Sequence, residues 1–145
     1  MLCQGEWLLC DDGIVRPIMR ARILGGDGTW QDIEFLLDTG ADRTVIAASV
    51  LDLLNLQHVR PKDRIGGVGG LADSVDVTTR ICLQQDDGQW ITVRGAYAAC
   101  LQPEALDMSV LGRDVLNFFA VIVDRAADRV LLLHGADSYA IQRRE

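Results

Sequence analysis

The chain has 145 residues, of which 49% are hydrophobic and 24% charged, a composition that predicts one globular domain with an ample core. Its formal net charge of -7 gives no support to nucleic-acid binding, which requires basic surfaces that neutralise phosphates. No apolar run approaches the length of a membrane span, so we expect no association with a membrane.

The first third of the chain predicts three strands, at residues 6–10, 14–24 and 30–37. The first two are separated by Asp11-Asp12-Gly13, which is typical of a hairpin turn. Because Pro17 cannot donate to a strand ladder, we place it near a sheet edge or a strand start. The third strand ends directly before Asp38.

The middle of the chain predicts a short helix, a glycine-rich hairpin and two strands. The apolar spacing of residues 47–54 fits a helix. The segment Ile65-Gly66-Gly67-Val68-Gly69-Gly70 has too many glycines for a stable strand interior, and it predicts a mobile hairpin tip. Residues 75–83 and 90–99 predict strands on either side of a turn at Asp86-Asp87-Gly88.

The last third begins with the apolar pair Val110-Leu111, which is broken by Gly112. Residues 113–119 have helical spacing, and strands are predicted at residues 120–123 and 129–133. We expect a single domain over residues 1–135 and a polar tail over residues 136–145, either frayed or a short helix. Many short strands between turn signals indicate an all-β domain with one or two short helices.

The stretch from Phe35 to Asp42 is the strongest candidate for a functional site. Here the apolar run Phe35-Leu36-Leu37 leads directly into Asp38-Thr39-Gly40-Ala41-Asp42. A carboxylate at the end of a buried strand costs free energy unless it is satisfied or used. We therefore interpret Asp38 as part of a site and not of a surface turn.

Three motifs occur in order along the chain. They are Asp38-Thr39-Gly40-Ala41-Asp42, the glycine run Ile65–Gly70, and Val110-Leu111-Gly112-Arg113-Asp114. This ordered set resembles the retroviral-type aspartic proteases, the retropepsins, over about residues 16–119, including Arg16-Pro17-Ile18-Met19. The resemblance implies a retropepsin-like acid protease fold, a closed, barrel-like all-β domain. Residues 111–133 look more like the end of a pepsin lobe, so the chain resembles a single-lobe cellular or bacterial relative.

The resemblance implies peptide hydrolysis by two carboxylates that share one proton. One takes a proton from water while the other polarises the scissile carbonyl. The chain carries one Asp-Thr-Gly, at Asp38, and no second Asp-Thr-Gly or Asp-Ser-Gly. Each chain therefore supplies half of a site, and we expect a twofold homodimer with Asp38 of each subunit at the axis. The expected substrate is an extended peptide or protein, and no cofactor is implied.

The same resemblance gives roles to the residues around Asp38. The Thr39 hydroxyl bonds across the dimer and braces the two loops, and Gly40 lets substrate and backbone approach closely. Ala41 and Asp42 are assigned to substrate contact.

Two arginines are implied to support the site. Arg113, directly after the break at Gly112, is expected to pair with Asp42. Arg16 is expected either to reach Asp42 of the other subunit or to be a solvated surface charge, which would contribute little.

The resemblance assigns Gly66, Gly67 and Val68 to a flap that closes over substrate and excludes water. The alternative is an exposed glycine loop of no consequence. The run is not a phosphate-binding loop, because no Lys-Ser/Thr follows it. Three apolar residues match positions that line the substrate pockets of the retroviral enzymes, with ordinary core packing as their alternative: Leu36, Met108 and Val110.

The four cysteines are widely scattered and form no C-x-x-C pair, and the two histidines stand alone, so no metal site is visible. We expect buried free thiols. The N-terminus lacks the basic region and long apolar core of a signal peptide. Together these features favour a reducing, cytoplasmic setting.

Two functions fit this reading of the sequence. One is a homodimeric aspartic endopeptidase, and the other is a retropepsin-fold dimerisation or peptide-binding module with little or no turnover, since fold does not fix function. The intact Asp-Thr-Gly favours the enzyme, because a dimerisation module has no need of paired carboxylates. Neither the net charge nor any motif supports a nucleotide-binding or nucleic-acid-binding function.

Overall fold

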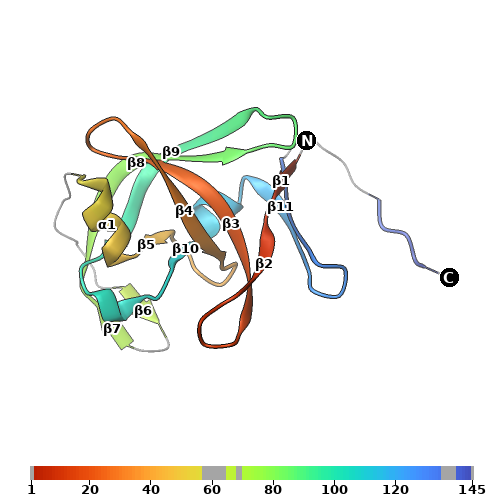
Figure 1. The fold of residues 1–145 in the computed structure, drawn as a ribbon, viewed down its shortest axis with the longest axis horizontal. Coiled ribbons are helices and arrows are strands. Elements are labelled where there is room, and N and C mark those ends of the chain that lie inside the picture. The colour runs from red at the N-terminus through yellow and green to blue at the C-terminus, as the bar shows by residue number, and fades with distance from the viewer. Residues whose placement is uncertain (1, 57–64, 68–69, 135–139, 145) are drawn as a thin grey trace.

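The computed structural model describes residues 2–56, 65–67, 70–134 and 140–144. These residues form twelve strands, two α-helices and one 3-10 helix (Figure 1). In chain order the elements are β1 (Leu2–Gln4), β2 (Glu6–Leu9), β3 (Val15–Leu24), β4 (Trp30–Leu37), β5 (Val45–Ile46), α1 (Ala48–Leu54), β6 (Ile65–Gly67), β7 (Gly70–Ala72), β8 (Ser74–Gln84), β9 (Trp90–Cys100), η1 (Pro103–Ala105), β10 (Ser109–Leu111), α2 (Arg113–Leu116), β11 (Phe119–Asp124) and β12 (Arg129–His134).

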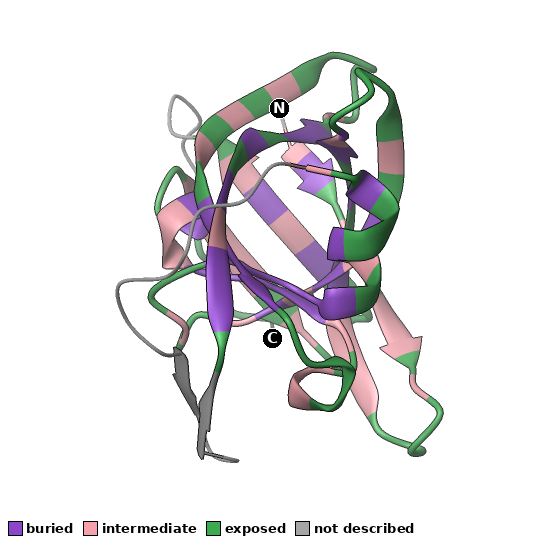
Figure 2. Ribbon diagram, turned by 90° about the vertical axis from the view of Figure 1, so that its left-hand side faces the viewer, coloured by how far each residue is buried: buried purple, intermediate pink, exposed green. Residues whose placement is uncertain are grey.

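Six strands close into a barrel in the order β3, β4, β10, β5, β9, β8 and back to β3. The barrel is closed by a short antiparallel pairing of β3 with β8, in which Arg22 lies opposite Cys82 and Ile23 opposite Ile81. Strand β2 adds to β3 outside this ring. Figure 2 shows strands arranged around an interior, with many of their segments coloured as buried. Closure leaves few unpaired strand edges within the ring, which is how small barrels avoid exposed edges.

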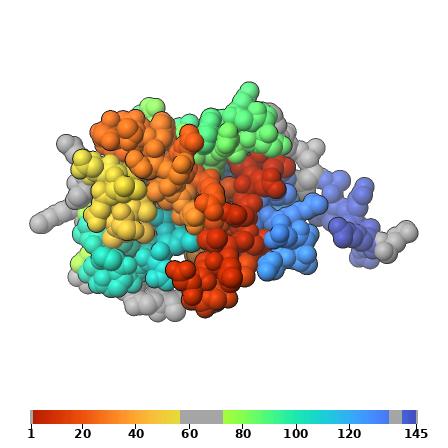
Figure 3. Space-filling model, viewed as in Figure 1, coloured from red at the N-terminus to blue at the C-terminus, as the bar shows by residue number. Residues whose placement is uncertain are grey.

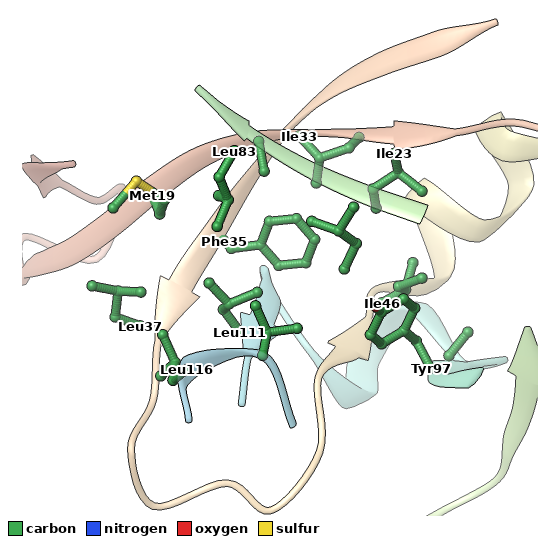
Figure 4. Close-up of a cluster of buried hydrophobic side chains, with 14 of the residues drawn as sticks. Met19, Ile23, Ile33, Phe35, Leu37, Ile46, Leu83, Tyr97, Leu111 and Leu116 are labelled. Carbon is green, nitrogen blue, oxygen red and sulfur yellow. The ribbon is translucent and has the colours of Figure 1, made fainter. Parts of the chain in front are cut away.

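The interior of the barrel is filled by apolar side chains. Strand β4 alternates along its last five residues, with Ile33, Phe35 and Leu37 buried and Leu36 half-buried on the other face. Phe35 is fully buried and lies in the middle of the cluster drawn in Figure 4, close to Leu111. Burying each such side chain stabilises the fold by about 1.5–3 kcal/mol. The period-2 pattern thus fixes which face of β4 is inside.

A second sheet, in the order β1, β12, β11, lies beside the barrel (Figure 1). The indole N–H of Trp7 in β2 links the two sheets, because it donates to the carbonyl oxygens of Asp124 and Arg129, each at 3.2 Å. Phe119 and Val121 of β11 pack against the barrel core. Within the described part of the chain, the outer edge of β11 has no strand partner.

The sequence-based expectations for the strands are confirmed. The first hairpin is β2 and β3, and Pro17 is the third residue of β3, opposite Trp7 of the outer strand. The strand expected at residues 30–37 has those bounds. The strands expected at residues 75–83, 90–99, 120–123 and 129–133 each extend by one or two residues, and the helix expected at residues 47–54 is α1.

One expectation about the helices is wrong. The helix predicted over residues 113–119 is the four-residue α2, which ends at Leu116. The helical spacing of apolar residues continues as far as Phe119. In the structure, however, Phe119 is the first residue of β11 and packs against the core. Tertiary packing therefore overrides the local pattern here. In the tail, residues 140–144 have no regular secondary structure, and residues 136–139 and 145 lie outside the described residues.

Adjacent leucines in α1 allow a test of the core. Leu54 is 1% exposed and Leu53 is 58% exposed. We predict that Leu54→Ala lowers the free energy of unfolding by about 2–5 kcal/mol, since it removes buried methyl groups and leaves a cavity. Leu53→Ala should change it by less than about 0.5 kcal/mol. Urea denaturation of both variants measures the difference, and equal losses would contradict this packing of α1.

Candidate active site

The loop that carries Asp38 starts where two parallel strands end side by side. Strand β10 pairs with β4 in parallel, with Val110 opposite Leu36 and Leu111 opposite Leu37. The backbone N–H of Asp38 extends this ladder by donating to the carbonyl oxygen of Leu111 at 3.1 Å. Because the carboxyl ends of parallel strands meet at one edge, the Asp38 motif and the Gly112 motif become neighbours.

The Asp38 carboxylate folds back on its own turn. Its Oδ1 accepts the backbone N–H of Gly40 at 2.9 Å, and its carbonyl oxygen accepts the N–H of Ala41 at 3.2 Å. This is the local bonding pattern in which an aspartate side chain stabilises a tight turn. The side chain is partly exposed, and its Oδ2 has no hydrogen-bond partner among the described residues. One carboxylate oxygen thus holds the loop while the other remains available.

Arg113 holds the loop from the start of α2. Its Nη1 donates to the carbonyl oxygen of Thr39 at 2.8 Å, and its Nη2 donates to a carboxylate oxygen of Asp42. Its backbone N–H donates to the carbonyl oxygen of Ala41 at 2.9 Å. Arg113 therefore donates hydrogen bonds to Thr39, Ala41 and Asp42 of the loop. Its planar guanidinium, with several N–H donors, suits the two side-chain bonds.

A second brace joins Asp114 to Thr44, which is fully buried. Asp114 Oδ1 accepts the backbone N–H of Thr44 at 2.9 Å and its hydroxyl at 2.7 Å. The Thr44 hydroxyl oxygen in turn accepts the N–H of Gly112 at 3.1 Å. The sequence analysis missed this pair. Its only sequence signal is a hydroxyl residue directly before the apolar pair Val45-Ile46 and a carboxylate directly after Gly112-Arg113.

Gly112 lies where two backbone segments touch. A Cβ at this position would meet the carbonyl carbon and oxygen of Arg43, each at 2.4 Å. No side chain fits this space without moving the backbone of the loop, so the position requires glycine. Nearby, burial together with the negative charge of Asp114 raises the pKa of the Tyr97 hydroxyl well above its ordinary value.

Arg16 forms its ion pair within its own hairpin. Its guanidinium donates to both carboxylate oxygens of Asp12, at 2.9 and 2.6 Å. This contact, with the N–H of Ile14, lowers the pKa of Asp12 to about 2. Within one chain Arg16 therefore pairs with Asp12 and not with Asp42, which pairs with Arg113.

The glycine-rich segment forms a hairpin. Strands β6 and β7 pair antiparallel, with Gly66 opposite Leu71 and Gly67 opposite Gly70. Val68, the third residue assigned to the flap, lies outside the described residues.

The three apolar candidates lie together in one groove. Leu36, Met108 and Val110 line a hollow of about 1040 Å³, as does Arg16. The hollow lies between the tip of the β2–β3 hairpin and residues 103–108, and Figure 3 shows an opening there. Asp38 follows Leu36 by two residues, so the groove runs beside the strands that lead to the carboxylate.

Other kinds of site find no support among the described residues. In that part of the chain no group of three or more His, Cys, Asp or Glu side chains is placed to hold a metal ion. None of its helices is long and apolar enough to cross a membrane.

A closed β-barrel with Asp-Thr-Gly on a braced loop defines a domain of the aspartic-protease class. Residues 15–124 match the sequence profile of the family described as retroviral aspartyl protease, so the chain belongs to this family. Membership supports aspartic protease function. No curated protein sequence matches the chain.

Two solved structures are similar to this chain. A retropepsin-like aspartic protease from Rickettsia conorii has 18% identity and a TM-score of 0.53, with 91% of this chain and 90% of that chain covered. At this identity the likeness concerns the fold. The EIAV protease in complex with the inhibitor HBY-793 has 28% identity and a TM-score of 0.49, with 70% and 86% covered. The family match and the likeness to the Rickettsia protein confirm the retropepsin-like fold expected from the motifs.

The brace between Asp114 and Thr44 gives a testable prediction. Asp114→Ala leaves the buried donors of Thr44 without an acceptor, so we expect a loss of about 1–3 kcal/mol in the free energy of unfolding. Asp114→Asn keeps one acceptor oxygen and should lose less. Thermal and urea unfolding of both variants make the comparison. An Asp114→Ala variant as stable as the wild type would mean that the Thr44 bonds contribute nothing.

Proposed function

We propose that this chain is an aspartic endopeptidase whose active unit is a homodimer. The observation that carries the proposal is the half-site around Asp38. A single Asp-Thr-Gly stands on a loop fixed by Arg113, and Oδ2 of Asp38 is free of partners among the described residues. A second copy would supply the second carboxylate.

In this proposal the two Asp38 carboxylates share one proton across the twofold axis. The ionised carboxylate takes a proton from a water, which attacks the scissile carbonyl. The protonated carboxyl donates to the carbonyl oxygen and stabilises its developing charge. Collapse of the tetrahedral intermediate transfers a proton to the leaving amine. Thr39 would bond across the dimer to its partner loop, and Gly40 would leave room for the substrate backbone.

The exposed end of the loop supports contact with a peptide main chain. The side chain of Asp42 is 83% exposed even though Arg113 holds it, and Ala41 is partly exposed beside it. Arg113 thereby orients a carboxylate that remains accessible to a substrate N–H. For Arg16, the pair with Asp12 favours a role within its own hairpin over a reach to the partner's loop.

The hairpin of β6 and β7 supports the proposed flap, to which Gly66, Gly67 and Val68 are assigned. A flap that closes over an extended peptide excludes water from the reacting bond. The groove floor of Leu36, Met108 and Val110 would then accept apolar side chains next to that bond.

The edge of β11, which has no strand partner among the described residues, is the surface that best suits a second copy. Phe119 to Val123 contain no charged residue, Val123 is 50% exposed, and Phe118 just before the strand is 57% exposed. An apolar, unpaired strand edge is a template for pairing with another chain. Two β11 strands paired antiparallel about a twofold axis would join two three-stranded sheets into one.

The four cysteines are free and three of them are buried, which supports the expected reducing, cytoplasmic setting. Burial, with the charges of Asp86 and Asp87, raises the pKa of the Cys3 thiol to about 11, so this thiol is poorly reactive near neutral pH. The proposed reaction needs no cofactor.

The carboxylate itself provides the direct test. Asp38→Asn keeps the size of the side chain but cannot share a proton, so we predict that it abolishes cleavage of a proteome-derived peptide library. The wild type should cleave with an acidic or mildly acidic optimum. Mass spectrometry of the products measures both, and sedimentation should show that the two proteins dimerise alike.

The alternative function makes the opposite prediction. If wild type and Asp38→Asn dimerise but are equally inert at every pH, the chain is a dimerisation or peptide-binding module. A strict monomer at high concentration would remove the two-carboxylate mechanism altogether.

The proposed interface has its own test. We predict that Val123→Lys raises the dimer dissociation constant at least tenfold, because it adds a charge to the edge of β11 in both copies. Leu53→Lys, at a similarly exposed aliphatic site on α1, is the matched control and should dimerise normally. Sedimentation equilibrium measures both. A normal dimer for Val123→Lys would mean that the subunits meet through another surface.

A further inference from the structure

The groove beside the Asp38 strand has an apolar floor and an acidic rim. Leu36, Met108 and Val110 contribute to the floor. Among the described residues that line it, five carry carboxylates and Arg16 alone is cationic. The five acidic residues come from the β2–β3 hairpin, from β4 and from the segment around η1: Asp11, Asp12, Glu34, Glu104 and Asp107.

Two of the five carboxylates are already paired. Asp12 binds Arg16, so the one cation of the lining is compensated within the groove. Glu34 accepts a hydrogen bond from Arg20 at 2.9 Å. The other three, Asp11, Glu104 and Asp107, are exposed and have no hydrogen bond or ion pair with any described residue. The groove therefore has a surplus of negative charge along its rim.

These carboxylates do not converge on one point. Within the described part of the chain, no three acidic, histidine or cysteine side chains are close enough to hold a metal ion. Instead, Asp11 lies on the hairpin side of the groove, and Glu104 and Asp107 lie on the side of η1. Charges spread along both sides of an apolar channel suit an extended cationic chain better than a single ion.

We propose that the groove selects peptides that carry a lysine or arginine two positions from the apolar residue seated on its floor. This inference rests on the proposed protease function. Alternate residues of an extended peptide face the same way, so a side chain two positions away is directed along the same groove. The floor binds an apolar side chain by burial, and the free rim carboxylates attract the basic one.

The dimer extends this preference to both sides of the cut bond. A twofold axis through the two Asp38 carboxylates generates a second, identical groove on the other side. Each groove receives one half of the peptide. A favoured substrate thus has an apolar centre with a basic residue on each flank, whereas acidic flanks are repelled at both ends.

A binding measurement tests the proposal without turnover. The probes are two fluorescein-labelled decapeptides that share an apolar Leu-Phe centre and differ only in having Lys or Glu two positions away on each side. The protein is Asp38→Asn, which holds peptide without cutting it. We expect the Lys peptide to bind at least tenfold more tightly at low salt, with a smaller ratio at about 0.5 M NaCl.

Reversing the charge of rim residues then tests whether the rim carboxylates cause the preference for the Lys peptide. Glu104→Lys/Asp107→Lys in the Asp38→Asn background should reduce the ratio to about one or invert it. The control, Asp87→Lys in the turn between β8 and β9, makes the same kind of change outside the groove and should leave the ratio intact. Equal binding of the two peptides, or an equal effect of both sets of changes, would overturn the proposal.

Turnover of the same peptides separates this inference from the function on which it rests. Wild type should cleave the Lys peptide with a kcat/KM at least tenfold above that of the Glu peptide. If neither peptide is cleaved but the binding preference holds, the protease function fails and the basic-peptide groove stands. If both are cleaved equally and bound equally, the protease stands and the inference fails.

Discussion

The site depends on the parallel pairing of β4 with β10. These strands are more than seventy residues apart in sequence, yet the register that sets Val110 opposite Leu36 brings the ends of both to one edge of the barrel. Asp38 leaves one strand and Gly112 leaves the other. Gly112 lies so close to Arg43 that a single added carbon would displace the loop. The contacts that join the Asp38 loop to α2 follow from this contact of two backbones, which only glycine permits.

The loop is then fixed by hydrogen bonds and not by burial. Asp42 is largely exposed, and Asp38 is only partly covered. What limits their movement is a set of hydrogen bonds to α2. The guanidinium and the backbone N–H of Arg113 donate to the loop, and the Asp114 carboxylate accepts from buried Thr44. This arrangement suits a catalytic group, because the geometry is set in advance while a carboxylate oxygen remains accessible.

Much of this could be predicted from the sequence, because alternation along a strand and the residues of a motif are local signals. The alternation of apolar residues gives the bounds of β4, and the motif residues identify Arg113. The brace of Asp114 on Thr44 and the pairing of Arg16 with Asp12 could not, because they depend on which segments become neighbours. The length of α2 could not be predicted either, because it depends on the packing of Phe119 against the core as part of a strand.

In the proposed protease, the same barrel edge has two separate tasks in substrate selection. The floor at Leu36 and Val110 is continuous with the core strands, so its shape is as fixed as the core itself and favours apolar side chains by burial alone. The rim residues Glu104, in η1, and Asp107, in the segment before β10, are exposed and lie outside both β4 and β10. In this proposal, the strands set the catalytic geometry, and Glu104 and Asp107, outside those strands, set the charge selection. A protease built in this way can alter the flanks that it prefers while the Asp38 loop stays the same.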